Sequence, residues 1–307
     1  MAKFIKKVLL FFAMIAIIDI ACGFGYGFLR AHAKGGDTQK NYYISEQCCD
    51  DILILGSSRA ARHYDSRVLE DSLGMSCYNC GEPGCGIITA YARYGMIEQR
   101  YKPKLVVYEI TPGFDYFKTD DYSKYLGRIR QYSYKQPVYQ INLELGDKFE
   151  RYRLVSNMYR NNSFLVQTVK DYFITKEYDK GYEPLYGLLN KEAQQEHIQS
   201  ACYEIDSVKF SYIERLIIEL QKEDLALCFM VSPRYINQES ASIRSLEYEP
   251  IIKLCDKYNV PFYNHIYVEE ISNSCEYFQD SGHMNKKGST LYSKYIVKDL
   301  NNLLLNK

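Results

Sequence analysis

The stretch Asp51-Ile-Leu-Ile-Leu-Gly-Ser-Ser58-Arg59 decides the fold. Its four consecutive aliphatic residues predict a short buried strand, because a strand covered on both faces reads as a continuous apolar run. Gly56 closes this run, and a Gly-Ser-Ser sequence is typical of a turn that opens a helix. The segment therefore predicts a strand–turn–helix unit that places a serine hydroxyl at the carboxyl end of a strand.

Short apolar strands and helices continue to alternate along the chain. We expect further strands at 76–79, 104–110, 225–231 and 260–264, and helices at 67–73, 87–100, 210–222, 250–258 and 286–302. Strands joined by helices form parallel sheets with right-handed crossovers. The pattern predicts a three-layer α/β/α sandwich around a parallel sheet of about five strands. Functional sites in such sheets lie in the loops beyond the carboxyl ends of the strands.

Two regions depart from this alternation. Residues 31–50 are polar and are expected to form a linker with a first helix or turn, before an α/β domain at 51–307. Residues 115–205 are charged and rich in tyrosine, and a structureless loop of that length is not expected inside a compact domain. We expect a helical insertion there, with helices around 147–159 and 163–172, lying over the carboxyl edge of the sheet as a lid or substrate groove.

Residues 1–30 predict a membrane segment. Three lysines precede an apolar run from Val8 to Leu29, which is only just long enough to cross a bilayer and has Asp19 in its middle. Basic residues before such a run keep the N-terminus in the cytoplasm. We therefore expect a single-pass signal anchor in the cell membrane, with the rest of the chain in the bacterial periplasm or at the cell surface. A signal peptide cleaved after Ala33 is the alternative, less favoured because Ala33 lies far from the apolar core.

Composition narrows the class of ligand. The 307 residues include 38 basic and 38 acidic side chains, and this balance argues against nucleic-acid binding, which needs a basic face. Of the ten cysteines, Cys22 belongs to the membrane segment, and the sequence leaves open whether the other nine form one or two disulfides or none. Cys77-x-x-Cys80 has no second pair at zinc-ligand spacing, so we expect no metal site. No motif for any other cofactor stands out.

A second motif, Asp280-Ser-Gly-His283-Met-Asn, supplies what the early serine lacks. A serine hydroxyl is a weak nucleophile until an imidazole takes its proton, and that imidazole needs a carboxylate to fix its tautomer. We therefore predict a catalytic triad of Ser58, His283 and Asp280. His63 is a rival base close to Ser58, but no carboxylate lies at matching spacing from it. Glu109, at the end of a predicted buried strand, is expected to pair with a nearby arginine.

These motifs resemble the SGNH (GDSL-type) hydrolases. Gly56-Ser57-Ser58 matches the family's Gly-Asp-Ser block with Ser58 in the nucleophile position, and Asp280-Ser-Gly-His283 matches its last block. The resemblance implies a flavodoxin-like sheet. It also implies an oxyanion hole built from the amides of Ser58 and of a glycine after the second strand, for which Gly84 is the better candidate and Gly81 the second.

One family block is altered. The third block normally supplies an asparagine whose side chain donates to the oxyanion, but the corresponding stretch here, Ile110-Thr-Pro-Gly-Phe-Asp115, contains none. Thr111 or a backbone amide is the expected substitute. Altered blocks of this kind are similar to those of membrane-anchored SGNH proteins for teichoic-acid D-alanylation and alginate O-acetylation. Arg59, directly after the serine, also resembles that group. Contact with an anionic substrate and a surface or helix-capping role are equal alternatives for it.

The resemblance implies an exported acyltransferase or esterase that acts on a cell-surface polysaccharide through an acyl-serine intermediate. A membrane-bound O-acyltransferase is the partner that such a role implies. The alternative is a non-catalytic SGNH-fold protein that binds glycan or that membrane partner. The missing asparagine favours the binding protein, whereas the combination of Ser58, Asp280 and His283 favours the enzyme.

Overall fold

The computed structural model describes residues 1–118, 122–176, 178–190 and 203–305. The chain divides into two compact units. Unit 1 comprises Met1–Gln47 and Asp121–Glu177, and unit 2 comprises Cys48–Asp120 and Tyr178–Lys307.

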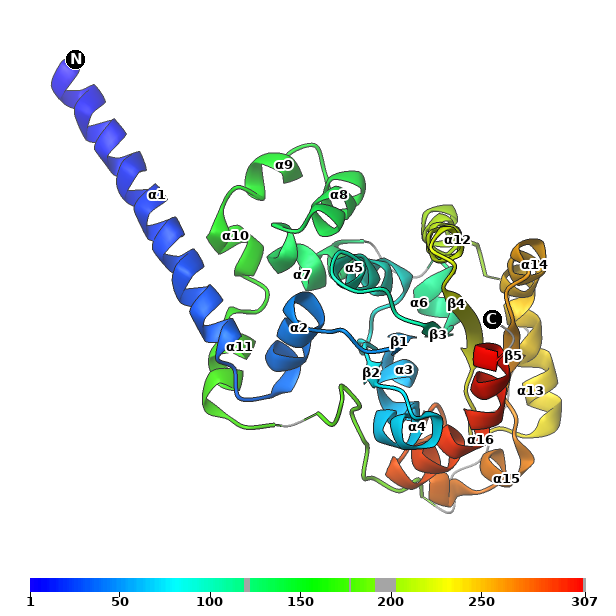
Figure 1. Cartoon of the computed structure of the whole chain (residues 1–307). Helices are drawn as coiled ribbons and strands as arrows, with labels where there is room; N and C mark the ends of the chain where they lie inside the picture. The colour runs from blue at the N-terminus through cyan, green and yellow to red at the C-terminus, as the bar shows by residue number, and fades with distance from the viewer. Residues whose placement is uncertain (119–121, 177, 191–202, 306–307) are drawn as a thin grey trace. The chain divides into compact units, whose positions relative to one another are not determined.

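Unit 2 is built on a parallel sheet of five strands in the order β2-β1-β3-β4-β5 (Figure 1). The strands are β1 (Ile52–Gly56), β2 (Cys77–Asn79), β3 (Leu105–Glu109), β4 (Ala226–Val231) and β5 (Phe262–Asn264). This strand order is that of the flavodoxin-like doubly wound fold, in which the chain reverses direction across the sheet beside β1. The predicted fold class is therefore confirmed, and each predicted strand is present to within a few residues.

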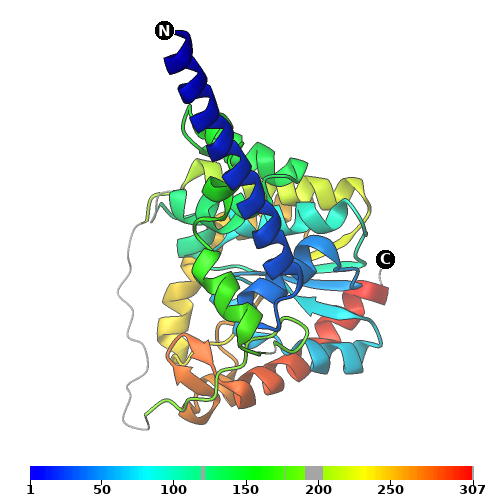
Figure 2. The same ribbon diagram turned by 90° about the vertical axis from the view of Figure 1, so that its left-hand side faces the viewer.

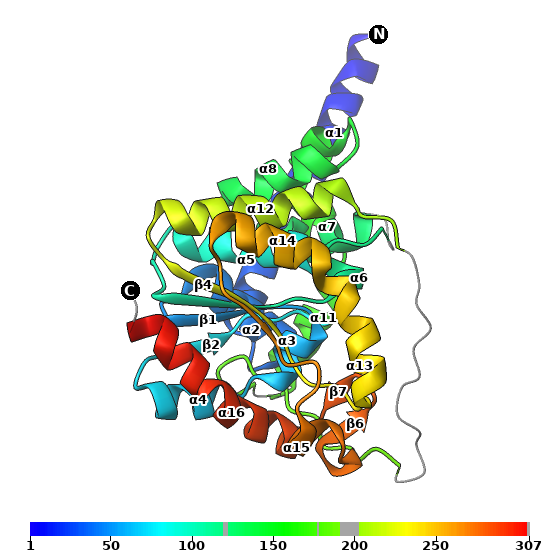
Figure 3. The ribbon, with the colours of Figure 1, turned by 90° about the vertical axis from the view of Figure 1, so that its right-hand side faces the viewer.

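Helices cover both faces of this sheet (Figure 3). One layer contains α3 (Ser58–His63), α4 (Ser66–Leu73) and α16 (Lys286–Leu305), and the other contains α5 (Ile87–Glu98), α12 (Ser207–Lys222) and α14 (Glu249–Tyr258). Alternate side chains of the strands point to each layer. On the α16 side, Ile54, Val107 and Cys228 pack in one core with Tyr292 and Ile296. All five predicted helices of the alternating pattern are present.

Several short elements lie at the carboxyl end of the sheet or in the loops between helices. They are α6 (Pro112–Asp115), α13 (Gln238–Ser245), α15 (Glu269–Ser272), and an antiparallel hairpin of β6 (Phe278–Asp280) and β7 (His283–Met284). The sequence pattern did not indicate the hairpin, because strands of two and three residues show no periodicity.

Unit 1 is helical. It contains α1 (Ala2–Ala31), α2 (Gly36–Glu46), α7 (Ser123–Ile129), α8 (Gln136–Leu145), α9 (Glu150–Arg153), α10 (Asn157–Asn161) and α11 (Leu165–Phe173). The N-terminal half of α1 extends alone, whereas its C-terminal half lies beside α10 and α11 (Figure 2). With a mean hydropathy of 2.4 over its most apolar window, α1 is long and apolar enough to cross a membrane, as an anchor or as a signal sequence.

The stretch at 115–205 does not behave as one module. Residues up to 120 and from 178 onward cluster with unit 2, whereas 121–177 cluster with the first 47 residues. The helix expected at 147–159 is present as α9 and α10, and the one at 163–172 as α11. Residues 119–121, 177 and 191–202 of the stretch lie outside the described residues. That this stretch acts as a lid or substrate groove stays a prediction.

Candidate active site

Ser58 stands at a sharp turn between β1 and α3. Gly56, the last residue of β1, has a φ of +133°, and a Cβ added there would lie 2.4 Å from the backbone oxygen of Glu109. Only glycine fits this close approach without strain. The turn therefore brings the chain out of the sheet and starts α3 at Ser58, with the hydroxyl at the carboxyl edge.

The structure brings together all three residues of the predicted triad. Ser58 Oγ lies 2.9 Å from His283 Nε2, and His283 Nδ1 lies 3.0 Å from both carboxylate oxygens of Asp280. An Nδ1–H donated to Asp280 leaves Nε2 free to accept the serine proton. The side chain of His283 is one-quarter exposed and that of Asp280 about half exposed, so a solvent-borne molecule can reach the site.

The β6–β7 hairpin sets the spacing of acid and base. Asp280 ends β6 and His283 begins β7, and Asp280 Oδ1 also accepts the backbone N–H groups of Gly282 and His283, each at 2.8 Å. Burial by itself raises the pKa of Asp280, but the His283 charge and these two amides lower it overall. Burial lowers the pKa of His283, against the opposing effect of Asp280. At neutral pH the site therefore holds an ionised carboxylate and a neutral imidazole.

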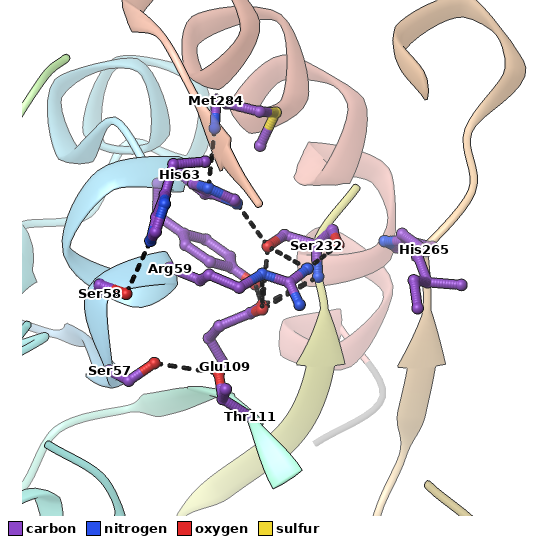
Figure 4. Close-up of polar contacts among 12 residues, drawn as sticks. Ser57, Ser58, Arg59, His63, Glu109, Thr111, Ser232, His265 and Met284 are labelled. Carbon is purple, nitrogen blue, oxygen red and sulfur yellow. Dashed lines mark hydrogen bonds and ion pairs between the residues drawn. The ribbon is translucent and has the colours of Figure 1, made fainter. Parts of the chain in front are cut away.

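His63, which the sequence offers only as a rival base, holds the hairpin in place. Its Nε2 accepts the backbone N–H of Met284 at 3.0 Å, so its proton must be on Nδ1, which lies 2.7 Å from Ser232 Oγ (Figure 4). Burial keeps the pKa of His63 well below the usual histidine value. A fully buried neutral imidazole with both nitrogens bonded is unavailable as a base. Because His63 shares α3 with Ser58, one short helix both carries the Ser58 hydroxyl and fixes the backbone next to His283.

Glu109 anchors the same network from the end of β3. Its fully buried carboxylate accepts the Tyr64 hydroxyl at 2.5 Å, the Ser232 hydroxyl at 2.9 Å and the Ser232 N–H at 3.0 Å. It also forms an ion pair with Arg59, with 3.2 Å between Oε1 and Nε (Figure 4). Burial raises the pKa of Glu109, opposed by Arg59 and by these hydrogen bonds. The expected pairing of Glu109 with an arginine is confirmed.

Of the alternatives for Arg59, contact with substrate needs correction. Only 3% of this residue is exposed, and its guanidinium also donates to the backbone oxygen of Ser232. A buried guanidinium that pairs with a buried carboxylate and a buried carbonyl stabilises the fold, because burial of the charge without such partners is strongly unfavourable. Arg59 therefore points into the protein interior, although it is adjacent to Ser58 in sequence.

The candidate oxyanion residues Gly84, Gly81 and Thr111 differ in their surroundings. Gly84 has a φ of +74°, and a Cβ there would meet no atom within 4 Å, so its turn is open. The N–H of Gly81 donates to Asn79 Oδ1 at 3.0 Å, and a Cβ there would lie 2.4 Å from the amide nitrogen of Ala61. Gly81 is thus a packing glycine. The hydroxyl of Thr111 lies 3.0 Å from that of Ser57, which places it near the turn but already hydrogen-bonded.

Asp115 is a buried carboxylate that the sequence analysis did not single out. It accepts the Tyr108 hydroxyl at 2.7 Å and the Thr111 N–H at 2.6 Å, and it caps α5 through the amide of Ile87. Burial raises the pKa of Asp115 to about 7. The residue joins the loop after β3 to the start of α5, and so orders the turns that flank Ser58. Its position next to a predicted loop is the only signal that the sequence carried.

Other ligand chemistry has little basis in the described residues. Within 1–118, 122–176, 178–190 and 203–305, no group of three or more His, Cys, Asp and Glu side chains is arranged to hold a metal ion. No disulfide joins any two of the nine cysteines in those ranges, and Cys202 lies outside them.

Comparisons with known proteins give little further guidance. No protein-family model matches the sequence, and no curated protein matches it. Among solved structures, the chain is similar to a protein described as a lipolytic protein of the G-D-S-L family from Desulfitobacterium hafniense. The two are 9% identical, the match covers 81% of this chain and 98% of that chain, and the TM-score is 0.39. A likeness this distant does not assign a function, so the site itself must carry the assignment.

Arg59→Met should destabilise the protein by about 3–5 kcal/mol, because it leaves the Glu109 carboxylate buried without its cation. Arg67→Met is the matched control, since the Arg67–Asp179 ion pair is exposed to solvent and should contribute little to the free energy of unfolding. Urea denaturation of the full-length protein in detergent, followed by circular dichroism, measures both. Equal midpoints for the two variants would contradict the structural role of Arg59.

His63→Leu should slow covalent labelling of Ser58 by a fluorophosphonate about 10²-fold, because the released hairpin no longer holds His283 in line with the serine. His63→Gln keeps an acceptor and a donor and should recover part of that rate. The thermal midpoint of each variant is measured alongside. A labelling rate that simply follows the thermal midpoint across the two variants would indicate general destabilisation instead of positioning.

Proposed function

We propose that this protein is an exported, membrane-tethered SGNH-type acyltransferase or esterase that modifies a cell-surface polysaccharide through an acyl-serine intermediate. The observation that carries the proposal is the hydrogen-bonded series Ser58–His283–Asp280, with donor–acceptor distances of 2.9 and 3.0 Å. A neutral imidazole between a hydroxyl and an ionised carboxylate is the arrangement that activates a serine. Its position at the carboxyl edge of a doubly wound sheet is where such folds place their sites.

In the proposed mechanism, His283 Nε2 takes the hydroxyl proton as Ser58 Oγ bonds to the carbonyl carbon of an ester. The tetrahedral intermediate collapses when its bond to the leaving oxygen breaks, and His283 returns the proton to that oxygen. A sugar hydroxyl or water then attacks the acyl-serine, with His283 again taking the proton and passing it to Ser58 Oγ. Asp280 stays ionised throughout and stabilises the imidazolium.

The oxyanion would be held by backbone amides. Ser58 begins α3 and Gly84 lies in an open turn, which makes their N–H groups the proposed donors. Thr111 would contribute if its hydroxyl accepted the proton of Ser57 and donated its own to the oxyanion. Loss of one oxyanion donor costs about 3–4 kcal/mol in a serine hydrolase. The absent asparagine is therefore expected to make this a slow enzyme toward simple esters.

Contacts within unit 1 support a retained anchor over a cleaved signal peptide. Tyr26 is 4% exposed, and its hydroxyl lies 2.8 Å from that of Thr168 on α11. Cleavage after Ala33 would remove this buried side chain and expose its partners. Three lysines before the apolar run favour a cytoplasmic N-terminus and an extracytoplasmic site. An acyl donor supplied through a membrane-bound O-acyltransferase fits that location.

The competing proposal is a non-catalytic protein that binds glycan or the membrane partner. The missing asparagine donor favours it. The intact hydrogen bonds of the triad oppose it, because glycan binding does not require a serine, a histidine and an aspartate in line. The two proposals differ in one observable, the chemical reactivity of Ser58.

An acyl adduct on Ser58 is expected when the full-length protein meets p-nitrophenyl acetate. Ser58→Ala should abolish the adduct and reduce turnover by on the order of 10⁴–10⁶-fold, whereas Ser57→Ala, its neighbour, should keep the adduct. Intact-mass spectrometry detects the added acetyl group. Release that accelerates with added polysaccharide would indicate transfer. The absence of both an adduct and ester turnover in the unsubstituted protein would favour the binding role.

The pH profile should reflect the lowered pKa of His283. Only the neutral imidazole can accept the serine proton, so acetate release from phenyl acetate should rise with pH through a midpoint below 6.5, the ordinary histidine value. The nearby Arg62 charge contributes to that depression. Arg62→Gln should therefore move the midpoint upward. A midpoint above 6.5 in the unsubstituted protein, or a downward move in the variant, would contradict the assignment of His283 as the base.

A further inference from the structure

Helix α11 of unit 1 buries its polar side and exposes its apolar side. Its buried residues are polar, Thr168 and Asp171, whereas its large apolar side chains are exposed. Val166 is 82% exposed and Phe173 70%, with Leu165 and Val169 beside them. A helix on the surface of a water-soluble domain turns its apolar stripe inward. We call the four apolar residues Leu165, Val166, Val169 and Phe173 the α11 face.

Specific contacts fix this orientation. Asp171 accepts the backbone N–H of Thr38 on α2 at 3.0 Å, and Thr168 bonds to Tyr26 on α1 at 2.8 Å. Turning the helix to bury its apolar side would break both contacts and leave a carboxylate without its amide partner. The outward position of the α11 face is therefore a property of the packing.

Further large apolar side chains of unit 1 are exposed. Phe24 and Phe28 are exposed on α1, and Phe149, Tyr152, Val155 and Met158 are exposed around α9 and α10. Extensive exposed apolar surface marks a contact with another molecule or with a membrane.

The length of α1 indicates that the molecule in contact with the α11 face is the membrane. The apolar residues before Asp19, Val8–Ile18, span about 16 Å at 1.5 Å per residue, against a hydrocarbon core of about 30 Å. To cross the bilayer, α1 must also place Asp19–Leu29 within it. That second half is the part beside which α10 and α11 pack (Figures 1 and 2). These helices must then lie at the depth of the leaflet nearer the C-terminal end of α1.

The environment of Asp19 is consistent with this depth. Its carboxylate accepts the Ser156 hydroxyl at 2.6 Å and the backbone N–H groups of Asn157 and Met158 at 2.8 and 2.9 Å. These groups open α10, so the charge also caps a helix N-terminus. A charged residue in a bilayer requires such partners. At Gly23 a Cβ would lie 2.6 Å from the Asn157 side chain, which explains a glycine at this contact.

We propose that the α11 face inserts into lipid, so that α10 and α11 form a platform embedded in one leaflet beside the anchor helix. The occupant is the bilayer itself. The two supports are independent, since the depth follows from the length of α1 and the apolar exposure follows from the packing of α11. The inference rests on retention of α1 as a membrane helix, and the experiment tests that retention separately.

The chain contains no tryptophan, so each introduced tryptophan is a probe without background. Val166→Trp and Phe173→Trp report on the α11 face in the full-length protein reconstituted in phosphatidylcholine vesicles. Phe12→Trp reports on the exposed half of α1, and Tyr295→Trp, at an exposed aromatic position on α16, is the matched control in unit 2. Emission wavelength, quenching by brominated phosphatidylcholine and quenching by aqueous iodide are measured for each variant.

The proposal expects blue-shifted emission and quenching by brominated lipid at positions 166 and 173, comparable with Phe12→Trp, while Tyr295→Trp responds only to iodide. If Phe12→Trp is lipid-quenched but positions 166 and 173 respond like Tyr295→Trp, the proposal is overturned and the face belongs to a protein partner. If Phe12→Trp is also in water, α1 is not inserted and the depth argument fails with it.

Discussion

The carboxylate of Glu109 is the constraint on which the site depends. It is fully buried at the end of β3, where an unpaired charge would be strongly unfavourable, and it must therefore gather donors around it. Arg59 comes from α3, Tyr64 from the residue after α3, and Ser232 from the end of β4. A single buried charge thereby joins the carboxyl ends of two strands to the helix that carries Ser58.

The same network reaches the base through His63. Glu109 orients the Ser232 hydroxyl, that hydroxyl accepts from His63 Nδ1, and His63 Nε2 accepts the Met284 amide. Each member has one arrangement of protons that satisfies all of these bonds, so the series is ordered from end to end. Ser58 and His283 come from distant parts of the sequence, yet both are held to α3. Their separation is fixed by hydrogen bonds in the interior and does not depend on a loop.

The sequence predicts the features that depend on local pattern. The continuous apolar run before Gly56 indicated a buried parallel strand, and Asp280-x-x-His283 placed a carboxylate and an imidazole three residues apart. The roles of Arg59 and His63 were not accessible in this way. Ser232 and Met284, the partners of His63, lie 169 and 221 residues away from it in sequence. Nothing in the spacing around Ser58 distinguishes an arginine that faces solvent from one that neutralises Glu109.

Unit 1 was harder to predict because its parts come from both sides of the first three strands. Residues 1–47 and 121–177 form one compact unit, so the chain crosses between the two units three times. Asp19 and Tyr26 bond α1 to α10 and α11, so α1 is part of the folded unit 1. The partners of Asp19 on α10 and of Tyr26 on α11 lie 138 and 142 residues away in sequence, so no local pattern could have indicated that α1 packs into a folded unit.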